Sequence, residues 1–354
     1  MNAKKKILVI EALDNNQGNK QMAMRSIECL SNVADVTVAE LSGWFSTIPS
    51  NVKVESYDLS IQYKNPQINS FFRSIKHLLV ARKLDRENHY DCIFFLSYHT
   101  IAFYLAKLWF KKYNKRLYVL HHINIDDLSR SEIKKWFFKR YVADVNHFVF
   151  EPFIKEYLEK KYCVDKRKIF VLPHPKNKYD FSIECKKYDC LGISGSNDEE
   201  LIEEYINEEE NNKIFKKNNI SILLRSKKYE YEDGYLKVVK AHFTDEEYCA
   251  LYANAYVVVL LFPGSFKYRM SGSIIDALSK RKSVLLSDIP LFRDYAERYP
   301  NVCRIGVRPK QVAEFIKKNK FKKTSREQIN DWNKFSKDYS NENIMEKFIE
   351  AFGL

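Results

Sequence analysis

Short apolar runs alternate along the first half of the chain with longer amphipathic stretches. The apolar runs predict buried strands, and the stretches between them predict helices because their apolar residues recur at helical spacing. Strands that alternate with helices are typical of a parallel, doubly wound sheet. The predicted strands are Lys6–Ile10, Asp35–Ala39, Cys92–Leu96, Leu117–Leu120, His147–Phe150 and Ile169–Leu172, and the predicted helices include Asn19–Leu30, Phe71–Arg86, Ile101–Lys112 and Ser131–Val142.

The pattern pauses at Pro173-His174-Pro175, and the polar stretch Lys176–Asp189 follows as a predicted linker. A second alternation of the same kind then begins. Its predicted strands are Cys190–Ser194, Ile220–Leu224, Lys237–Ala241, Tyr256–Leu261, Ser283–Leu286 and Cys303–Ile305, and its predicted helices are Asp198–Ile206, Asp245–Ala253, Ser273–Ser279, Pro290–Arg298 and Pro309–Lys318.

Two Rossmann-like domains in succession therefore follow from the pattern, and the length of 354 residues agrees with two domains. The predicted boundaries are 1–175 for the first domain and 176–338 for the second. A last amphipathic helix, Asn343–Phe352 within residues 339–354, could cross back to the first domain. The fold class is α/β, with two doubly wound parallel sheets facing across a cleft.

Composition narrows the class of protein. Hydrophobic residues make up 45% and charged residues 30%, an ordinary globular balance. No run of about 18 apolar residues is present that could span a membrane. After the first lysines, the apolar run Ile7–Ile10 stops at Glu11, too early for a signal peptide. A cytoplasmic protein is expected.

The seven cysteines are scattered, odd in number and without a CxxC spacing. Several stand in apolar runs, as Cys92 does, which favours reduced core residues over disulfides or zinc ligands. Neither a metal site nor a cofactor is expected.

Most of the candidate chemistry lies in 256–290, which has the pattern strand, loop, helix, strand. Backbone N–H groups at a helix N-terminus bind a diphosphate, and a glycine lets the backbone approach it. An arginine neutralises phosphate charge, and an acidic residue one turn into the helix can accept from ribose hydroxyls. The alternative is a serine that only caps the helix and an acid that only favours its dipole. The residues in these roles are Arg269, Ser271, Gly272, Ser273 and Asp276.

The segment 268–290, YRMSGSIIDALSKRKSVLLSDIP, resembles the donor-binding segment of family 4 (group 1) glycosyltransferases, and 241–263, AHFTDEEYCALYANAYVVVLLFP, resembles the segment before it. The resemblance implies the GT-B architecture, a nucleotide-diphosphate-sugar donor bound by the second domain, an acceptor bound by the first, and no metal. It also implies hexosyl transfer with retention of configuration.

The chain departs from that family pattern in two places. The first of two acidic positions spaced eight apart falls on Tyr268, whereas the second matches Asp276. The loop 192–197, where the family has a basic pair, contains no base. Ser194, Gly195 and Ser196 in this loop could still offer backbone N–H groups to the donor, or they form a plain turn. Phosphate charge would then be neutralised by Arg269, Lys267 or Arg225.

The first domain offers polar residues after its strands, where ligands bind in parallel sheets. Asn16, Gln17 and Gly18 follow the first strand and His99 the third; these are the predicted acceptor contacts. His121 and His122 follow the fourth strand, and strand alternation sends them to opposite sides, so we expect only one to act on the substrate. A histidine with a pKa near neutrality suits proton transfer; packing in the core is the alternative. Glu151, after the strand His147–Phe150, is a further candidate carboxylate.

The net charge is +13, and residues 101–150 hold ten Lys/Arg against four Asp/Glu. Basic aromatic stretches in 71–83 and 132–142 are typical of helices that lie on anionic bilayers, although the same stripes could face the core. We expect peripheral contact with the inner leaflet through 107–140, and no nucleic-acid partner.

The predicted function is transfer of a sugar from a nucleotide-diphosphate sugar to an acceptor hydroxyl. The acceptor is expected to be a saccharide, in particular a lipid-linked saccharide of bacterial surface polysaccharide synthesis. Two alternatives remain: a non-catalytic GT-B subunit that binds a sugar and partners an active enzyme, and an epimerase of the same architecture.

Overall fold

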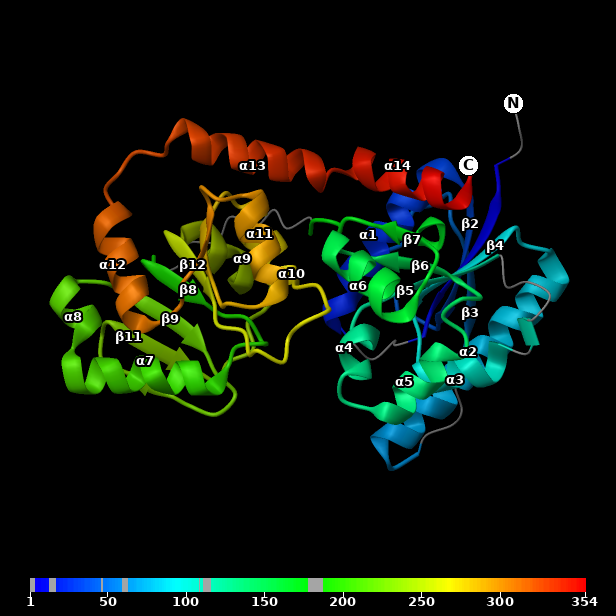
Figure 1. Cartoon of the computed structure of the whole chain (residues 1–354), viewed down its shortest axis with the longest axis horizontal. Helices are drawn as coiled ribbons and strands as arrows, with labels where there is room; N and C mark the ends of the chain where they lie inside the picture. Colours follow the sequence, from blue (N-terminus) through cyan, green and yellow to red (C-terminus); the bar gives the residue numbers. More distant parts are fainter. Residues whose placement is uncertain are drawn as a thin grey trace. The chain divides into compact units, whose positions relative to one another are not determined.

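The computed structural model describes residues 4–12, 17–45, 47–58, 63–107, 109–110, 116–177 and 187–354. The chain divides into two compact units (Figure 1). Unit 1 contains residues 1–175, 268–270 and 339–354, and unit 2 contains residues 176–267 and 271–338. The short segment Tyr268–Met270 thus belongs to unit 1, although the chain on both sides of it belongs to unit 2.

Within the described residues, unit 1 has a seven-stranded parallel sheet in the order β3-β2-β1-β4-β5-β6-β7. The chain reverses its direction of winding between β1 and β4, which pair directly. The strands are β1 Lys6–Glu11, β2 Asp35–Leu41, β3 Lys53–Tyr57, β4 Cys92–Ser97, β5 Leu117–Leu120, β6 Asn146–Val149 and β7 Ile169–Val171.

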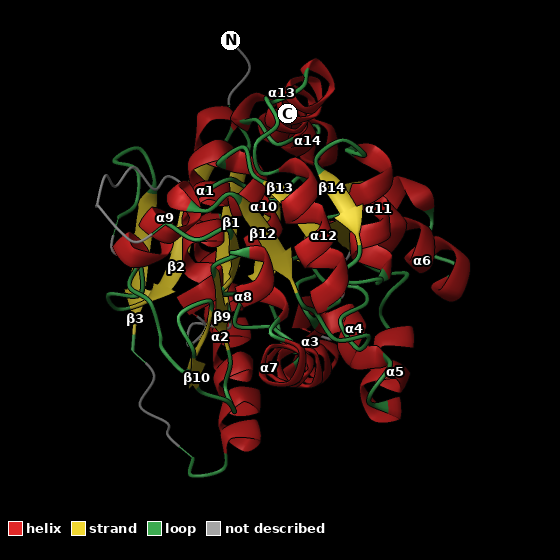
Figure 2. Ribbon diagram, turned by 90° about the vertical axis from the view of Figure 1, so that its left-hand side faces the viewer, coloured by secondary structure: helices red, strands yellow, loops and turns green. Residues whose placement is uncertain are grey.

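Helices cover both faces of this sheet. Leu8 and Ile10 of β1 pack on one side with α2, α3, α5 and α6, and Ile7 and Val9 pack on the other with α1 and α14. Figure 2 shows α1 and α14 above β1–β3 and α2, α3 and α5 below them. The helices are α1 Gln17–Val33, α2 Pro66–Asn88, α3 Thr100–Lys107, α4 Asn124–Leu128, α5 Glu132–Lys139, α6 Pro152–Tyr162 and α14 Asn341–Phe352.

Unit 2 repeats the topology. Its described sheet has the order β10-β11-β9-β8-β12-β13-β14, parallel except for the β10–β11 pair. The strands are β8 Cys190–Gly192, β9 Ile222–Arg225, β10 Tyr231–Glu232, β11 Leu236–Val239, β12 Val257–Leu260, β13 Ser283–Leu286 and β14 Cys303–Ile305, and the helices are α7 Glu199–Asn212, α8 Ile214–Asn218, α9 Asp245–Asn254, α10 Gly272–Ser279, α11 Pro290–Arg298, α12 Pro309–Asn319 and α13 Arg326–Asp338.

The predicted fold class is confirmed as two Rossmann-like parallel-sheet domains. Several described elements were not predicted. β3, with the sequence KVESY, is mostly polar because it is an edge strand, and the others are the two-residue strand β10 and the helices α4, α6, α8 and α13. None of the helices in the described part of the chain is both long and apolar enough to cross a bilayer.

Candidate functional site

In unit 2, small hydroxyl residues meet where the strand order reverses, between β8 and β12. Ligands bind at this place in doubly wound sheets, outside the carboxyl ends of the strands. Ser194 follows β8, and Ser273 lies in the first turn of α10; the Ser273 hydroxyl donates to Ser194 Oγ at 3.2 Å. The loop after β8 and the N-terminus of α10 are therefore in contact.

Two glycines set the shape of this edge. A Cβ on Gly192 would lie 2.6 Å from Leu224 Cδ2 and 2.9 Å from Val259 Cγ1, so only glycine fits where β8 ends between its neighbours. A Cβ on Gly195 would lie 3.2 Å from Arg225 Nη1. The Arg225 guanidinium thus lies against the bare backbone of the Gly195 loop, and its Nη2 donates to His242 Nδ1 at 2.8 Å.

The N-terminus of α10 carries no side-chain cap from Ser271 and no acidic residue in its first turn. Its first N–H groups are therefore not satisfied by a capping side chain, and the helix dipole favours an anion there. The alternative that the Ser271 side chain caps this helix is therefore wrong. In the loop after β8 the Ser196 N–H donates to Ser194 Oγ at 3.3 Å, so this part of the loop forms a turn. The N–H groups at the start of α10 and the Arg225 guanidinium form a small, positively polarised edge of the sheet.

Asp276 lies one turn into α10 and is partly buried. Asn177 Nδ2 donates to its Oδ1 at 2.9 Å, and the Tyr248 hydroxyl donates to its Oδ2 at 3.2 Å. Burial raises the pKa of this carboxyl to about 7, although the two hydrogen bonds oppose the shift. The carboxyl is therefore held at the balance between its charged and neutral forms near neutral pH.

Arg269 and Tyr268 belong to unit 1. Arg269 Nε lies 2.9 Å from Oδ2 of the buried Asp126, whose other oxygen accepts from the Tyr268 N–H. The Tyr268 ring stacks on Tyr157 with centroids 3.9 Å apart. The position that is acidic in family 4 therefore holds an aromatic side chain packed on α6, and a phosphate contact by Arg269 stays a prediction.

At the corresponding edge of unit 1, the buried Glu11 ends β1 and accepts a hydrogen bond from the Ser97 hydroxyl at the end of β4. In the sequence, Glu11 is the residue that ends the apolar run Ile7–Ile10, and nothing in the pattern indicates a role for it. Asn16 lies outside the described residues. Gln17 and Gly18 begin α1, and their side chains are not described.

His121 is buried, and a chain of hydrogen bonds fixes its tautomer. His147 Nε2 donates to the Val142 carbonyl at 2.7 Å, so its Nδ1 accepts from His121 Nε2 at 2.9 Å. His121 Nδ1 then accepts from the Tyr98 hydroxyl at 3.0 Å, and Tyr98 accepts from Tyr141 at 3.4 Å. Both ring nitrogens of His121 are thus used inside unit 1.

His122 points to the other side of the strand, as alternation predicts, and donates from Nε2 to the Leu96 carbonyl at 2.8 Å. Burial lowers the pKa of His122 to about 4, and burial also lowers the pKa of His121. The expectation of a near-neutral pKa is therefore wrong for this pair, because neither ring is solvated. A catalytic role for either one stays a prediction.

Glu151 is fully buried at the N-terminus of α6. Its Oε1 accepts from the Tyr339 hydroxyl at 3.1 Å, and Tyr339 lies just before Ser340, the N-cap of α14. This contact ties the last helix to the sheet of unit 1, which is a structural task for the carboxylate. A catalytic role of Glu151 remains an untested prediction.

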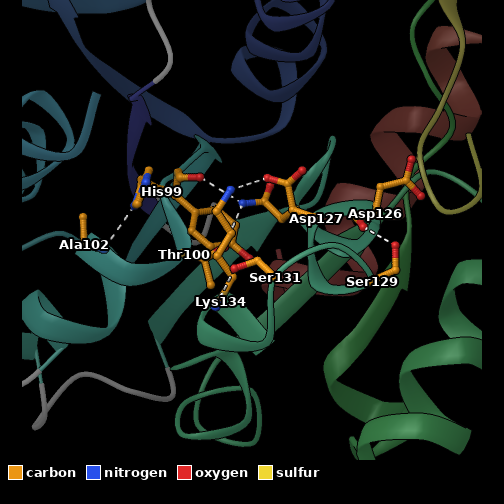
Figure 3. A network of polar contacts seen from close by, with 10 residues as sticks. His99, Thr100, Ala102, Asp126, Asp127, Ser129, Ser131 and Lys134 are labelled. Atoms are coloured by element: carbon orange, nitrogen blue, oxygen red, sulfur yellow. Dashed lines mark hydrogen bonds and ion pairs between the residues drawn. The ribbon is translucent and has the colours of Figure 1, made fainter. Parts of the chain in front are cut away.

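His99 lines a pocket of about 710 Å³ in unit 1, at the carboxyl ends of β4 and β5. Its Nδ1 accepts from the Ala102 N–H at 3.3 Å, which leaves its proton on Nε2, and burial lowers its pKa to about 4. Figure 3 shows this network together with the Lys134–Asp127 ion pair at 2.6 Å. The lining residues are Ile68, Ser70, Phe71, Phe72, Tyr98, His99, Thr100, Ile101, Ile123, Asn124, Asp127, Ser131, Ile133 and Lys134.

The pocket has an apolar mouth and a polar end. Ile68, Phe72 and Ile133 are 46%, 40% and 66% exposed, unusual values for side chains of this kind. Asn124 is buried; its Nδ2 donates to the Tyr98 carbonyl at 2.9 Å, and its Oδ1 has no hydrogen-bond donor among the described residues. This arrangement suits a ligand with an apolar body and a hydroxyl that can donate to Asn124.

In the part of the chain that the structure describes, no cluster of three His, Cys, Asp or Glu residues is placed to hold a metal ion. The hydroxyl, amide and guanidinium groups described above suit a phosphate or a sugar.

No protein-family model matches this sequence, and no curated protein matches it. Solved structures do resemble it over the full chain. Sucrose-phosphate synthase from Thermosynechococcus elongatus superposes with a TM-score of 0.69 at 12% identity, covering 99% of this chain and 98% of that chain. A glycosyltransferase from Rickettsia africae gives 0.62 at 14% identity, with 99% and 98% covered. UDP-N-acetylglucosamine 2-epimerase from Rickettsia bellii gives 0.60 at 12% identity, with 99% and 97% covered.

These similarities confirm the GT-B resemblance at the level of fold. At such low identities they establish the fold and nothing more. Membership of family 4 stays a prediction, and the fold alone does not separate transferases from an epimerase.

Proposed function

We propose that the protein is a glycosyltransferase that moves a sugar from a nucleotide-diphosphate sugar to an acceptor hydroxyl. The observation that carries the proposal is the edge of unit 2 where the Ser194–Ser196 loop, Arg225 and the uncapped N-terminus of α10 come together. Backbone N–H groups at the start of α10 and a guanidinium suit a diphosphate, and Asp276 would accept from ribose hydroxyls.

In the proposed reaction, the acceptor oxygen forms a bond to the anomeric carbon while the bond from that carbon to the diphosphate oxygen breaks, and the acceptor hydroxyl proton passes to the diphosphate or to solvent. Negative charge then grows on the leaving diphosphate. Fixed N–H dipoles and a guanidinium stabilise such charge without a metal, because they are already oriented before the reaction. Whether the configuration is retained, as the family resemblance implies, is decided by the anomeric proton signals of the product.

The acceptor is proposed to bind to unit 1, in the pocket that His99 lines. Its volume of about 710 Å³ suits a substantial organic ligand. The apolar mouth supports a lipid-linked saccharide, the acceptor class of the proposed role in bacterial surface polysaccharide synthesis. The polar end would then receive the hydroxylated part of the molecule.

Peripheral membrane contact through 107–140 belongs to the same proposal. Ile133 and Trp136 are 66% and 49% exposed on α5, and the Arg140 guanidinium lies 4.2 Å from the centre of the Trp136 ring. Exchange of Lys134, Lys135, Lys139 and Arg140 for Gln should then reduce vesicle binding and leave nucleotide binding intact.

A panel of nucleotide-diphosphate sugars tests the main proposal. A ligand that binds only the folded state raises the stability of the protein in proportion to the logarithm of the ligand concentration, and the unfolding temperature rises with it. The sugar that stabilises the protein is then supplied with and without alkyl glycoside acceptors. Formation of a new glycoside supports transfer. Release of an epimerised sugar would replace the proposal with an epimerase, and binding without turnover would replace it with a non-catalytic sugar-binding subunit.

A further inference from the structure

A strongly basic segment connects α12 to α13 in unit 2 (Figure 1). Residues 315–326 read FIKKNKFKKTSR, with six Lys/Arg and no Asp/Glu. Every residue from 321 to 327 is exposed, and the Phe321 side chain is 91% exposed, the highest value among the large hydrophobic residues that the structure describes. Water surrounds this ring almost completely, and Lys320 Nζ lies 5.7 Å from its centre, so the ring adds little to the packing of the fold.

A pocket of about 460 Å³ adjoins the segment, at the amino ends of β12 and β13. Because the proposed donor residues follow the carboxyl ends of the strands, this pocket lies at the opposite edge of the same sheet. Every charged residue in its described lining is a base, namely Arg281, Lys282, Lys322 and Lys323. Its uncharged polar residues are Ser283, Asn301, Asn319, Thr324, Ser325 and Gln328.

The charge of this segment is poorly compensated. Lys320 lies 2.7 Å from Asp189, and Lys282 donates to two backbone carbonyls. Among the described residues, no carboxylate lies within ion-pair distance of Lys322 or Lys323. The bases of α5 differ, because Lys134 and Lys135 already pair with Asp127 and Glu132.

We propose that residues 317–326 and this pocket bind the surface of a bilayer that contains anionic phospholipids. Lys322, Lys323 and Arg281 would contact lipid phosphates, and Phe321 would enter the interfacial region between headgroups. Basic residues beside an anionic surface strengthen binding, and an aromatic ring gains from leaving water. A nucleic acid suits the site less well, because a base stacked on Phe321 would meet no second wall.

The test is sedimentation with vesicles of phosphatidylcholine alone or mixed with phosphatidylglycerol. Binding should need the anionic lipid and should weaken as salt rises, because ions screen exposed charges. Lys322→Gln with Lys323→Gln should weaken binding by about five-fold for each base removed. Phe321→Ser should weaken it by about ten-fold. All three side chains are exposed, so the fold should be unaffected, and the unfolding temperature checks this.

A matched control removes the same charge elsewhere in unit 2. Lys216 and Lys217 on α8 are exposed, and no large exposed aromatic residue lies within the short α8 segment. Exchange of both for Gln should leave vesicle binding nearly unchanged. An equal loss in the control, or no loss in Phe321→Ser, would overturn the proposal in favour of a general effect of net charge. Tighter binding to a single-stranded oligonucleotide or to inorganic phosphate than to vesicles would also overturn it.

This inference does not depend on sugar transfer, because the vesicle experiment uses no substrate. Nucleotide titration of the same variants distinguishes a failure of the lipid proposal from a failure of the transferase proposal. If vesicles bind and nucleotides do not, the transferase proposal fails alone; if nucleotides bind and vesicles do not, the lipid proposal fails alone. The quadruple Gln variant of α5 shows whether α5 contributes separately to vesicle binding.

Discussion

The two units have sheets of corresponding strand order, yet the carboxyl edges of these sheets carry opposite chemistry. Strands β3-β2-β1-β4-β5-β6 of unit 1 correspond to β11-β9-β8-β12-β13-β14 of unit 2. After β8 come small residues, such as Ser194 and Gly195, and the backbone is left bare. After β4 and β5 come Tyr98 and His121, which fill the edge with a buried hydrogen-bonded chain.

This difference shows how one topology can bind two kinds of ligand. Small residues after a strand leave N–H groups and a nearby guanidinium available to an anion. In unit 1, large residues follow β4 and β5, and the pocket that His99 lines lies beside α2, α3 and α5, with apolar walls. The following predictions test whether the carboxyl edge of the sheet in unit 2 binds an anion and whether the pocket of unit 1 that His99 lines binds an amphiphile.

The largest expected effect concerns Asp276 and pH. Its pKa is raised from an ordinary 3.8 to about 7, so the folded state holds a proton that the unfolded chain has lost. This contribution to stability is complete below pH 3.8 and is lost as the pH rises to about 7. The slope can reach about 1.4 kcal/mol per pH unit. Denaturant unfolding of Asp276→Asn should show a flatter pH dependence across this window.

Nucleotide binding tests whether the Asp276 carboxyl also contacts the donor. Ribose hydroxyls that donate to Asp276 favour its charged form, so binding near pH 6 should release a proton. Calorimetry in buffers of different ionisation enthalpy measures that proton. An unchanged proton count in Asp276→Asn would remove the carboxyl from the donor site.

The second effect concerns the Arg269–Asp126 pair in unit 1. Asp126 is 2% exposed, so Arg269→Ala leaves a buried carboxylate without this cation and should lower the free energy of unfolding by about 3 kcal/mol. Lys134→Ala is the control, because its ion pair with Asp127 is more exposed and should cost less than about 1 kcal/mol. Equal losses would contradict the buried-pair interpretation. If Arg269 also contacts the donor, the folded variant should bind a nucleoside diphosphate more weakly but a nucleoside equally well.

The third effect concerns Arg225 in unit 2. Hydrogen bonds to charged groups contribute about 1.5–3 kcal/mol, so Arg225→Ala should weaken nucleoside diphosphate binding about ten- to hundred-fold and nucleoside binding little. Lys227→Ala removes a neighbouring charge as the control. A similar loss for nucleoside and diphosphate would mean that Arg225 contacts the base or only shapes the Gly195 loop.

Sequence reasoning predicted the sheets and the helix Ser273–Ser279 because both depend on neighbouring residues in the chain. The apolar run VVVL forms β12, and α10 begins at Gly272, one residue before the predicted start. It could not predict that Tyr268–Met270 would pack with unit 1, because that depends on contacts with Asp126 and Tyr157, far away in the chain. Asn124 was also missed, since α4 is only five residues long and too short to show a helical period.

The histidines show the same limit at the level of single atoms. Alternation along β5 separates His121 from His122, and the structure agrees. The state of each ring, however, depends on His147, Val142 and Leu96, which reach it only through the folded sheet. A sequence pattern predicts on which side of a strand a histidine lies, but it does not predict how far burial lowers the pKa of that histidine.

The smallest expected effect tests whether the pocket of unit 1 that His99 lines binds an amphiphile. Ile133 lines the pocket and is 66% exposed, so Ile133→Ser should change the free energy of unfolding by no more than about 0.5 kcal/mol. Affinity for alkyl glucosides, measured calorimetrically below their micelle concentrations, should rise about four-fold for each methylene that enters the pocket. The variant should lower that affinity about five-fold, because part of the apolar wall is gone. Leu105→Ser, 44% exposed on α3 and outside the pocket lining, should have no such effect. If both variants lose affinity equally, the glucosides adsorb to exposed apolar surface in general, and the amphiphile would have to bind elsewhere.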